Sequence, residues 1–177
     1  MPFEILNRKK QYQGHAFDVS ILQILLPNGR ERGYDLVEHG DSVTILPVDD
    51  AGEIHFVTQH RVGSKGDLVE LPAGVLEAGE DPLGCAQREL REEIGMASRE
   101  MRDLGGFYLA PGYTDEYMTV FLATGLYESP LDPDADEFLN ISRMPVKSVY
   151  QKAFQGEFHD GKTLAALLLG YPILMGF

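Results

Sequence analysis

Hydrophobic and polar residues alternate along the first part of the chain, and this period of two predicts β-strands. The alternation runs through residues 17–26 and changes phase after Ile21, which indicates a β-bulge. The Pro-Asn-Gly sequence at residues 27–29 is a hairpin signal, and residues 32–39 are predicted to form the returning strand. We therefore expect a small antiparallel β appendage over residues 1–40.

From residue 41 onward the strand patterns are those of a core sheet. Residues 43–48 are mostly apolar, residues 49–52 supply a turn, and residues 54–59 alternate again. Further on, the sequence GGFYLAPGYTDEYMTVFLATGL reads as a strand, a Gly/Pro-rich loop and a strand. We therefore expect a main domain over residues 41–177.

Two helices are predicted near the end of the chain. The first begins at Pro145 and ends at Gly156, with Phe154 on its apolar face. The second is capped by Asp160, and its apolar run ends at Gly170. Strands and helices together place the chain in the α/β class.

Another helix is predicted between the strands, over residues 82–94. Asp81 is a suitable N-cap, Pro82 takes the first helical position, and Gly95 ends the helix. One face carries an apolar stripe formed by Leu83, Ala86, Leu90 and Ile94.

Carboxylates lie beside that stripe. At about 100° per residue, Glu89 and Glu93 stand one turn apart on its flank, while Glu92 lies further round, near Arg88. Together with a backbone carbonyl, such a pair forms a hard-oxygen site that suits Mg²⁺ or Mn²⁺. The alternative is a solvated acidic helix whose Arg–Glu pairs face water.

This helix is the centre of a longer motif, GVLEAGEDPLGCAQRELREEIGM, at residues 74–96. The motif resembles the signature box of the Nudix hydrolases, and every fixed position matches, with Met96 in the last apolar position. The resemblance implies a Nudix-type α/β/α sandwich with a mixed sheet, to which the N-terminal antiparallel β appendage is added.

The resemblance also implies a divalent metal cofactor, Mg²⁺ or Mn²⁺. It implies Glu89 and Glu93 as metal ligands, with the carbonyl of Ala73 beside them and Glu92 as a further ligand or an orienting catalytic group. Gly74 is expected to let the backbone turn, so that the Ala73 carbonyl points at the metal.

The loop after the motif resembles the ADP-ribose pyrophosphatase branch of the family. Pro111 stands sixteen residues after Gly95, an offset typical of that branch, and Tyr113 and Glu116 follow it. The branch implies Pro111 and Tyr113 as substrate-binding residues. Tyr113 and Tyr108 are candidates to stack on a base or a ribose, and core packing is the alternative for both.

Two arginines are also assigned to the substrate site. Residues 58–61 resemble the strand end that carries a phosphate-binding arginine in the family, so Arg61 is a candidate donor to a diphosphate. An ordinary surface arginine is the alternative. Arg32 belongs to a segment, residues 30–48, that resembles the N-terminal part of ADP-ribose pyrophosphatases. In those relatives the segment forms a dimer and lends residues to the partner's substrate pocket.

The general base is expected outside the motif. The stretch at residues 127–137 contains the acidic sequence ESPLDPDADE and fits neither a helix nor a strand. Family relatives place there a glutamate that swings onto the metals, and Glu137 matches it, with Asp136 as a stand-in. Glu116 is the second candidate. Glu137 is favoured because a closing loop excludes water from the reaction.

Composition narrows the class of protein further. A net charge of −13 argues against nucleic acid or an anionic membrane as a partner. No apolar run reaches the ~18 residues of a membrane-spanning helix, and the N-terminus does not read as a secretory signal. The only cysteine, Cys85, is expected to be a packing residue, which fits a cytoplasmic location. His55 and His60 are expected to be structural or exposed.

The sequence thus predicts a cytoplasmic, homodimeric enzyme that uses a divalent metal to hydrolyse a nucleoside diphosphate derivative, with ADP-ribose, cleaved to AMP and ribose 5-phosphate, as the first candidate. A nucleotide-sugar pyrophosphatase is one alternative. A non-catalytic Nudix-fold sensor that binds ADP-ribose is another, although the complete set of carboxylates in the motif favours an enzyme.

Overall fold

The computed structural model describes residues 3–132 and 139–176. The chain forms two compact units. The first comprises Met1–Asp41 with Phe107–Met118, and the second comprises Ser42–Gly106 with Thr119–Phe177. No helix within the described ranges is long and apolar enough to cross a membrane.

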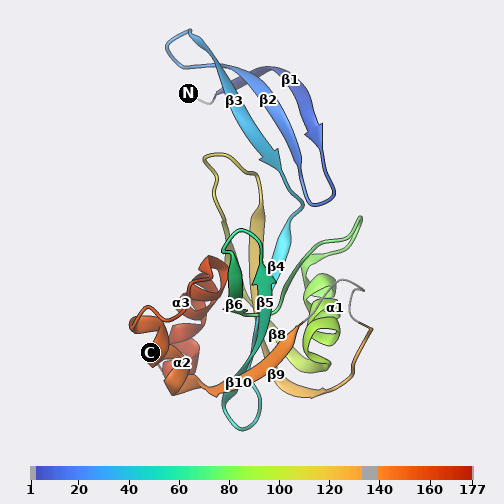
Figure 1. The fold of residues 1–177 in the computed structure, drawn as a ribbon, viewed down its shortest axis with the longest axis vertical. Coiled ribbons are helices and arrows are strands. Elements are labelled where there is room, and N and C mark those ends of the chain that lie inside the picture. The colour runs from blue at the N-terminus through green and yellow to red at the C-terminus, as the bar shows by residue number, and fades with distance from the viewer. Residues whose placement is uncertain (1–2, 133–138, 177) are drawn as a thin grey trace. The chain divides into compact units, whose positions relative to one another are not determined.

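The N-terminal unit contains a three-stranded antiparallel sheet in the order β1-β2-β3 (Figure 1). Its strands are β1 (Glu4–Gln13), β2 (Asp18–Leu25) and β3 (Glu31–Glu38). The predicted hairpin is confirmed, because Gly29 has a φ of 78° and its amide donates to the Leu26 carbonyl at 2.9 Å. The sequence did not predict β1, since every residue of this strand is exposed and charged residues interrupt its alternation.

The predicted bulge in β2 is wrong. β2 pairs with β3 without a register shift, and the irregularities lie in β1, opposite β2. The apparent change of phase arises because Ile21 is 39% exposed, on the face opposite to buried Ser20 and Ile24. The bulge was therefore predicted wrongly because Ile21, an apolar residue, lies on the open face of a regular strand.

Residues 107–118 join this unit through contacts with the end of β3. Val37 and Thr114 form a parallel bridge. The His39 amide donates a hydrogen bond to Oδ1 of Asp115 at 2.9 Å. The Gly/Pro-rich loop that the sequence assigned to the main domain is thus attached to the N-terminal sheet.

The main unit contains two sheets, with strand orders β10-β5-β6 and β7-β4-β9-β8. The strands are β4 (Ser42–Pro47), β5 (Glu53–Arg61), β6 (Gly66–Glu70), β7 (Ala73–Val75), β8 (Met96–Tyr108), β9 (Tyr117–Glu128) and β10 (Asn140–Pro145). β4 is buried along its whole length, as predicted for a core strand. β8 and β9 extend at one end into residues of the N-terminal unit.

The helices are α1 (Pro82–Ile94), α2 (Val146–Phe154) and α3 (Gly161–Met175). Figure 1 shows α1 on one side of the strands and α2 and α3 on the other. The predicted α/β/α sandwich with a mixed sheet is therefore confirmed. On the α1 side, Ala86, Leu90 and Ile94 pack against apolar residues of β4, β5 and β9.

Three details of the helix predictions are wrong. α3 continues past Gly170, and a Cβ at this glycine would lie 2.4 Å from Cδ2 of Leu46. Gly170 therefore allows close packing of α3 on β4 and does not end the helix. Leu83 and Phe154 are 44% and 75% exposed, and the buried face of α1 instead includes Cys85.

Candidate active site

Helix α1 begins and ends at the residues that the sequence predicts. The Asp81 carboxylate accepts a hydrogen bond from the Gly84 amide at 2.8 Å, and Pro82 occupies the first turn. Gly95 has a φ of 69°, and its amide donates to the Leu90 carbonyl. These caps fix the ends of the helix that presents the carboxylates.

Glu89 and Glu93 are the buried carboxylates of this helix, with exposed fractions of 8% and 6%. They share a face with buried Ala86 and Leu90, so their predicted position beside the apolar stripe is confirmed. The Ala73 amide donates to Oε2 of Glu93 at 3.2 Å, which joins β7 to α1. Because an ionised carboxylate is costly to bury alone, such a pair needs partners of opposite charge.

Arg88 supplies such a partner and connects three carboxylates. Its Nε and Nη2 donate to Glu80 at 3.0 and 2.9 Å, and its Nη1 donates to Glu89 at 2.7 Å and to Glu92 at 2.9 Å. Hydrogen bonding from Arg88 lowers the pKa of Glu80 to about 2. Glu80, followed by Glu89, raises the pKa of Arg88 in return. The contact between Arg88 and Glu92 that the helical spacing predicts is confirmed.

The interpretation of Gly74 as a turn residue is wrong. Gly74 is not one of the described glycines with a positive φ, so its backbone conformation does not require glycine. A Cβ at this position would lie 1.8 Å from Oε1 of Glu89. Gly74 therefore leaves the space that the Glu89 carboxylate occupies.

The residues present fit a hard divalent cation. Glu89 and Glu93 offer carboxylate oxygens beside the backbone of Ala73, and oxygen is the ligand atom that Mg²⁺ and Mn²⁺ prefer. Among the described residues, no three His, Cys, Asp or Glu side chains converge into a preformed metal site. Arg88 and the Ala73 amide engage the carboxylates instead. Metal ligation by Glu89, Glu92, Glu93 and the Ala73 carbonyl stays a prediction.

Arg61 ends β5 in an ion pair that the sequence did not predict. Its Nε and Nη2 donate to the two carboxylate oxygens of Glu70 at 2.9 and 2.8 Å. The Glu70 side chain is 1% exposed and also accepts a hydrogen bond from Lys162. The Arg61 side chain is 43% exposed, so part of it remains accessible. The sequence did contain a sign of this buried ion pair, because the acidic Glu70 interrupts the otherwise apolar run at residues 68–72.

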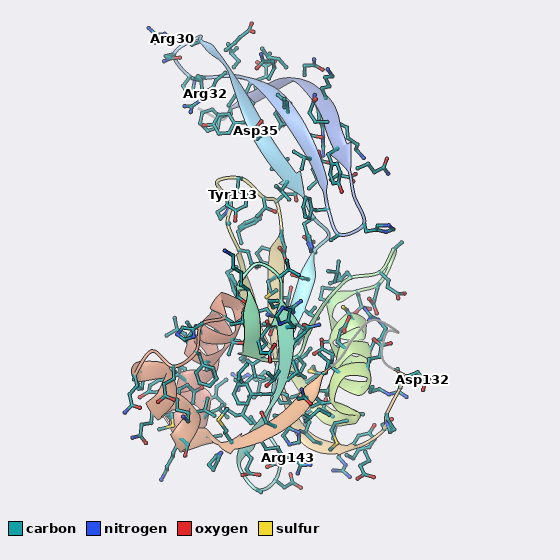
Figure 2. All side chains as sticks on the ribbon, viewed as in Figure 1. Arg30, Arg32, Asp35, Tyr113, Asp132 and Arg143 are labelled. Carbon is teal, nitrogen blue, oxygen red and sulfur yellow. The ribbon has the colours of Figure 1, made fainter. Side chains whose placement is uncertain are left out.

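The other substrate-binding candidates belong to the N-terminal unit. Figure 2 shows Arg32 on β3, and its guanidinium lies 5.2 Å from the centre of the Tyr34 ring. Pro111 lies in the turn that precedes Thr114. Tyr108 and Tyr113 are 57% and 60% exposed, so the core-packing alternative is wrong for both. Their roles in binding stay predictions.

The two candidates for the general base have different surroundings. Oε2 of Glu116 lies 3.7 Å from Nδ1 of His39, within the N-terminal unit. Glu137 and Asp136 lie outside the described residues, which stop at Asp132 (Figure 2) and resume at residue 139. The choice of Glu137 stays a prediction.

The expectations that His55 and His60 are structural or exposed, and that Cys85 is a packing residue, are confirmed. His55 is buried, and its Nε2 lies 3.0 Å from Oδ2 of Asp49. His60 is exposed and pairs with Asp67 at 2.9 Å. Cys85 is buried, and burial raises the pKa of its thiol to about 12.

Together, the sandwich, the capped helix and its buried carboxylates define an α/β enzyme with a carboxylate-rich site. The chain belongs to the Nudix family, since the family model described as "NUDIX domain" matches residues 38–167. The resemblance that the motif at residues 74–96 indicated is therefore confirmed, and the chain is an enzyme of the Nudix hydrolase kind.

Several known proteins are similar to this chain over nearly its whole length. The ADP-ribose pyrophosphatase of Bacillus subtilis (strain 168) is 34% identical over 164 residues, which cover 92% of this chain and 89% of that protein. The methanol dehydrogenase activator of Bacillus methanolicus is 32% identical over the same shares of the two chains. A solved structure described as ADP compounds hydrolase aligns with a TM-score of 0.88 and 25% identity, covering 99% of this chain and 96% of that one.

Proposed function

We propose that this protein hydrolyses ADP-ribose to AMP and ribose 5-phosphate in the presence of Mg²⁺ or Mn²⁺. The observation that carries the proposal is the pair of buried carboxylates, Glu89 and Glu93, on a helix that also carries Arg88 and Glu92. The similarity to the Bacillus subtilis ADP-ribose pyrophosphatase supports the choice of substrate, and so does the loop that contains Pro111.

Hydrolysis of a diphosphate requires a base that deprotonates the attacking water and cations that neutralise the charge on the phosphate oxygens. A water oxygen forms a bond to one phosphorus of the diphosphate, the bridging P–O bond breaks, and the departing phosphate carries away the electron pair. Bound divalent ions neutralise phosphate oxygens and lower the pKa of a coordinated water. In our proposal Glu89, Glu93 and the Ala73 carbonyl hold the metal with help from Glu92, and Glu137 takes the proton of the attacking water.

In our proposal the substrate is bound by exposed cationic and aromatic side chains. Arg61 offers the exposed part of its guanidinium to the diphosphate, where a planar cation matches phosphate oxygens. Tyr113, two residues after Pro111, offers an exposed ring for stacking, and Arg32 adds a further cation for the nucleotide. These groups would bind a nucleotide without selecting the moiety that leaves.

We further propose that the enzyme is a cytoplasmic homodimer that associates through its N-terminal unit. Ile5, Leu6 and Tyr12 of β1 are 62%, 44% and 56% exposed. Apolar side chains gathered on one exposed strand are typical of a protein–protein contact. Cys85 as the only cysteine agrees with a reducing compartment.

A substrate panel tests the proposal. Purified protein is incubated with ADP-ribose, UDP-glucose or GDP-mannose, with Mg²⁺, with Mn²⁺ or with chelator, and products are separated by chromatography. We expect AMP and ribose 5-phosphate from ADP-ribose only when metal is present. Cleavage of the nucleotide sugars alone would move the protein to a different substrate class. Binding of ADP-ribose without cleavage would favour a regulatory role, which the similarity to the methanol dehydrogenase activator keeps as a second candidate.

A further inference from the structure

A buried carboxylate on β6 is paired with two cations, one from β5 and one from the start of α3. Glu70, the last residue of β6, accepts hydrogen bonds from Arg61, the last residue of β5, and from Lys162 in the first turn of α3. The Lys162 side chain is 12% exposed and also lies 3.1 Å from Oδ2 of Asp160. Two neighbouring strands and a helix residue 92 positions further along the chain thus meet at one carboxylate.

The position of this carboxylate is fixed by further hydrogen bonds. Asp160 caps α3 by accepting from the Thr163 amide at 3.0 Å, and the Thr163 hydroxyl accepts a hydrogen bond from the Leu71 amide at 2.9 Å. Leu71 directly follows Glu70, so the start of α3 is joined to the end of β6 by backbone and side chain together. These hydrogen bonds restrain the backbone beside Glu70, so the carboxylate is held in place before a ligand binds.

Glu70 is charged and determines the orientation of Arg61. Burial alone would raise the pKa of Glu70, but the hydrogen bonds from Arg61 and Lys162 outweigh burial and hold it below its ordinary value. The two parallel hydrogen bonds use Nε and Nη2 of Arg61 and fix the plane of the guanidinium. Nη1 is the part of the group that Glu70 does not engage.

The oriented arginine lies within electrostatic reach of the candidate active site. Glu93 is one of the groups whose charge raises the pKa of Arg61, after Glu70 itself. Both residues belong to the main unit. A free arginine side chain must lose rotamer freedom when it binds a ligand, whereas one already held by a carboxylate has lost it beforehand. Lys162 also pairs with Glu70, so the carboxylate is held from two sides.

We propose that Glu70 is a positioning residue, supported by Lys162, that holds Arg61 in the orientation in which it binds the diphosphate of the substrate. This inference rests on the proposed function, which assigns Arg61 to the phosphates. Glu70 itself touches neither the substrate nor the metal. Its contribution therefore passes through Arg61 and affects substrate binding more than the chemical step.

A double-mutant cycle tests this dependence. We compare the wild type with Glu70→Gln, Arg61→Ala and the double variant, and use Asp67→Asn as the control, because Asp67 is an exposed acid on the same strand. In Glu70→Gln we expect KM to rise about tenfold with kcat changed less than about threefold. In the Arg61→Ala background the same change should raise KM by less than about twofold, since the group that it orients is gone. Lys162→Met should raise KM in the same direction by a smaller factor.

Additive effects in the cycle, or a fall in kcat with unchanged KM, would overturn the inference. Binding of pyrophosphate with Mg²⁺, measured by calorimetry, provides a readout that does not need turnover and separates the two proposals. If no diphosphate in the panel is cleaved but pyrophosphate binds less tightly to Glu70→Gln and to Arg61→Ala, the proposed function fails and this inference stands. Equal pyrophosphate affinity in the wild type and both variants would overturn it. If Glu70→Gln does not fold, the same comparison between Lys162→Met and wild type decides.

Discussion

The backbone amide of Ala73 donates a hydrogen bond of 3.2 Å to Oε2 of Glu93, so β7, where the motif begins, and the helix within the motif are joined at one carboxylate. The same side chain is 6% exposed. Glu93 therefore has one oxygen engaged by the backbone, while its charge remains the feature that a divalent cation would use. Replacing the carboxylate by an amide separates these two roles.

For Glu93→Gln we expect normal folding and a fall in kcat of about 10²-fold or more. The glutamine oxygen can still accept the Ala73 hydrogen bond, but the negative charge is lost. Turnover and Mg²⁺ dependence are measured in both proteins, with Glu100→Gln on the exposed surface as the control. Unchanged Mg²⁺ dependence with near-normal turnover would show that this carboxylate is not a metal ligand.

Gly74→Ala tests the contact between β7 and the helix. The new methyl group would occupy the place of Oε1 of Glu89, so this carboxylate must move. We expect weaker activation by Mg²⁺ and a fall in kcat of about tenfold or more, with a smaller effect on thermal stability. The control is Gly63→Ala, where a Cβ meets no atom within 4 Å. Similar activity in both variants would contradict the role of Gly74 described above.

Glu137→Gln and Glu116→Gln together identify the general base. If Glu137 takes the proton from water, its replacement lowers kcat by ~10²–10⁴ and leaves KM nearly unchanged. Glu116, which lies beside His39, should then affect mainly KM. Both variants are assayed at saturating Mg²⁺. Full activity of Glu137→Gln with collapse of Glu116→Gln would transfer the role to Glu116.

The ion pair between Arg88 and Glu80 predicts a pH dependence of stability. The pKa of Glu80 in the folded protein is about 2, below its ordinary value of 4.5. The pair therefore stabilises the fold fully above the ordinary value, and this stabilisation is lost as the pH falls from about 4.5 towards about 2. We expect the Tm of Glu80→Gln to fall less steeply than that of the wild type over this range. Parallel curves in thermal unfolding at several pH values would refute the assignment.

The proposed dimer is tested by light scattering at micromolar concentration. A monomer has a mass of 19.7 kDa, and we expect about twice this value. Replacing Ile5 by Lys places a charge on exposed β1 and should shift the protein towards monomer. The control is Lys9→Glu on the same strand. A wild type that scatters as a monomer would disprove association through this unit.

Local signals explain what the sequence predicted well. The two ends of α1 follow from Asp81 and Gly95, and its burial pattern follows from the spacing of a few side chains. These interactions span only a few residues, so the sequence displays both partners close together. The hairpin at residues 27–29 was also predictable from nearby residues, because one glycine, Gly29, supplies the positive φ.

What the sequence did not predict depends on partners that are distant along the chain. Lys162 and Glu70 are separated by 92 residues, and no periodic pattern relates them. Gly74 and Gly170 were interpreted as a turn and a helix stop, yet both are glycines because another element approaches them closely. A single sequence shows the residue type but not the neighbour that requires it.

Cys85 makes the protein well suited to site-specific labelling. It is the only thiol of the sequence, it is buried, and burial raises its pKa to about 12, so the reactive thiolate is scarce near neutral pH. The natural chain should therefore react negligibly with a maleimide dye. A cysteine introduced at Asp132, the last described residue in the first half of the acidic stretch, would carry such a dye alone. Its fluorescence would then report directly whether that part of the chain changes its surroundings when ADP-ribose is added.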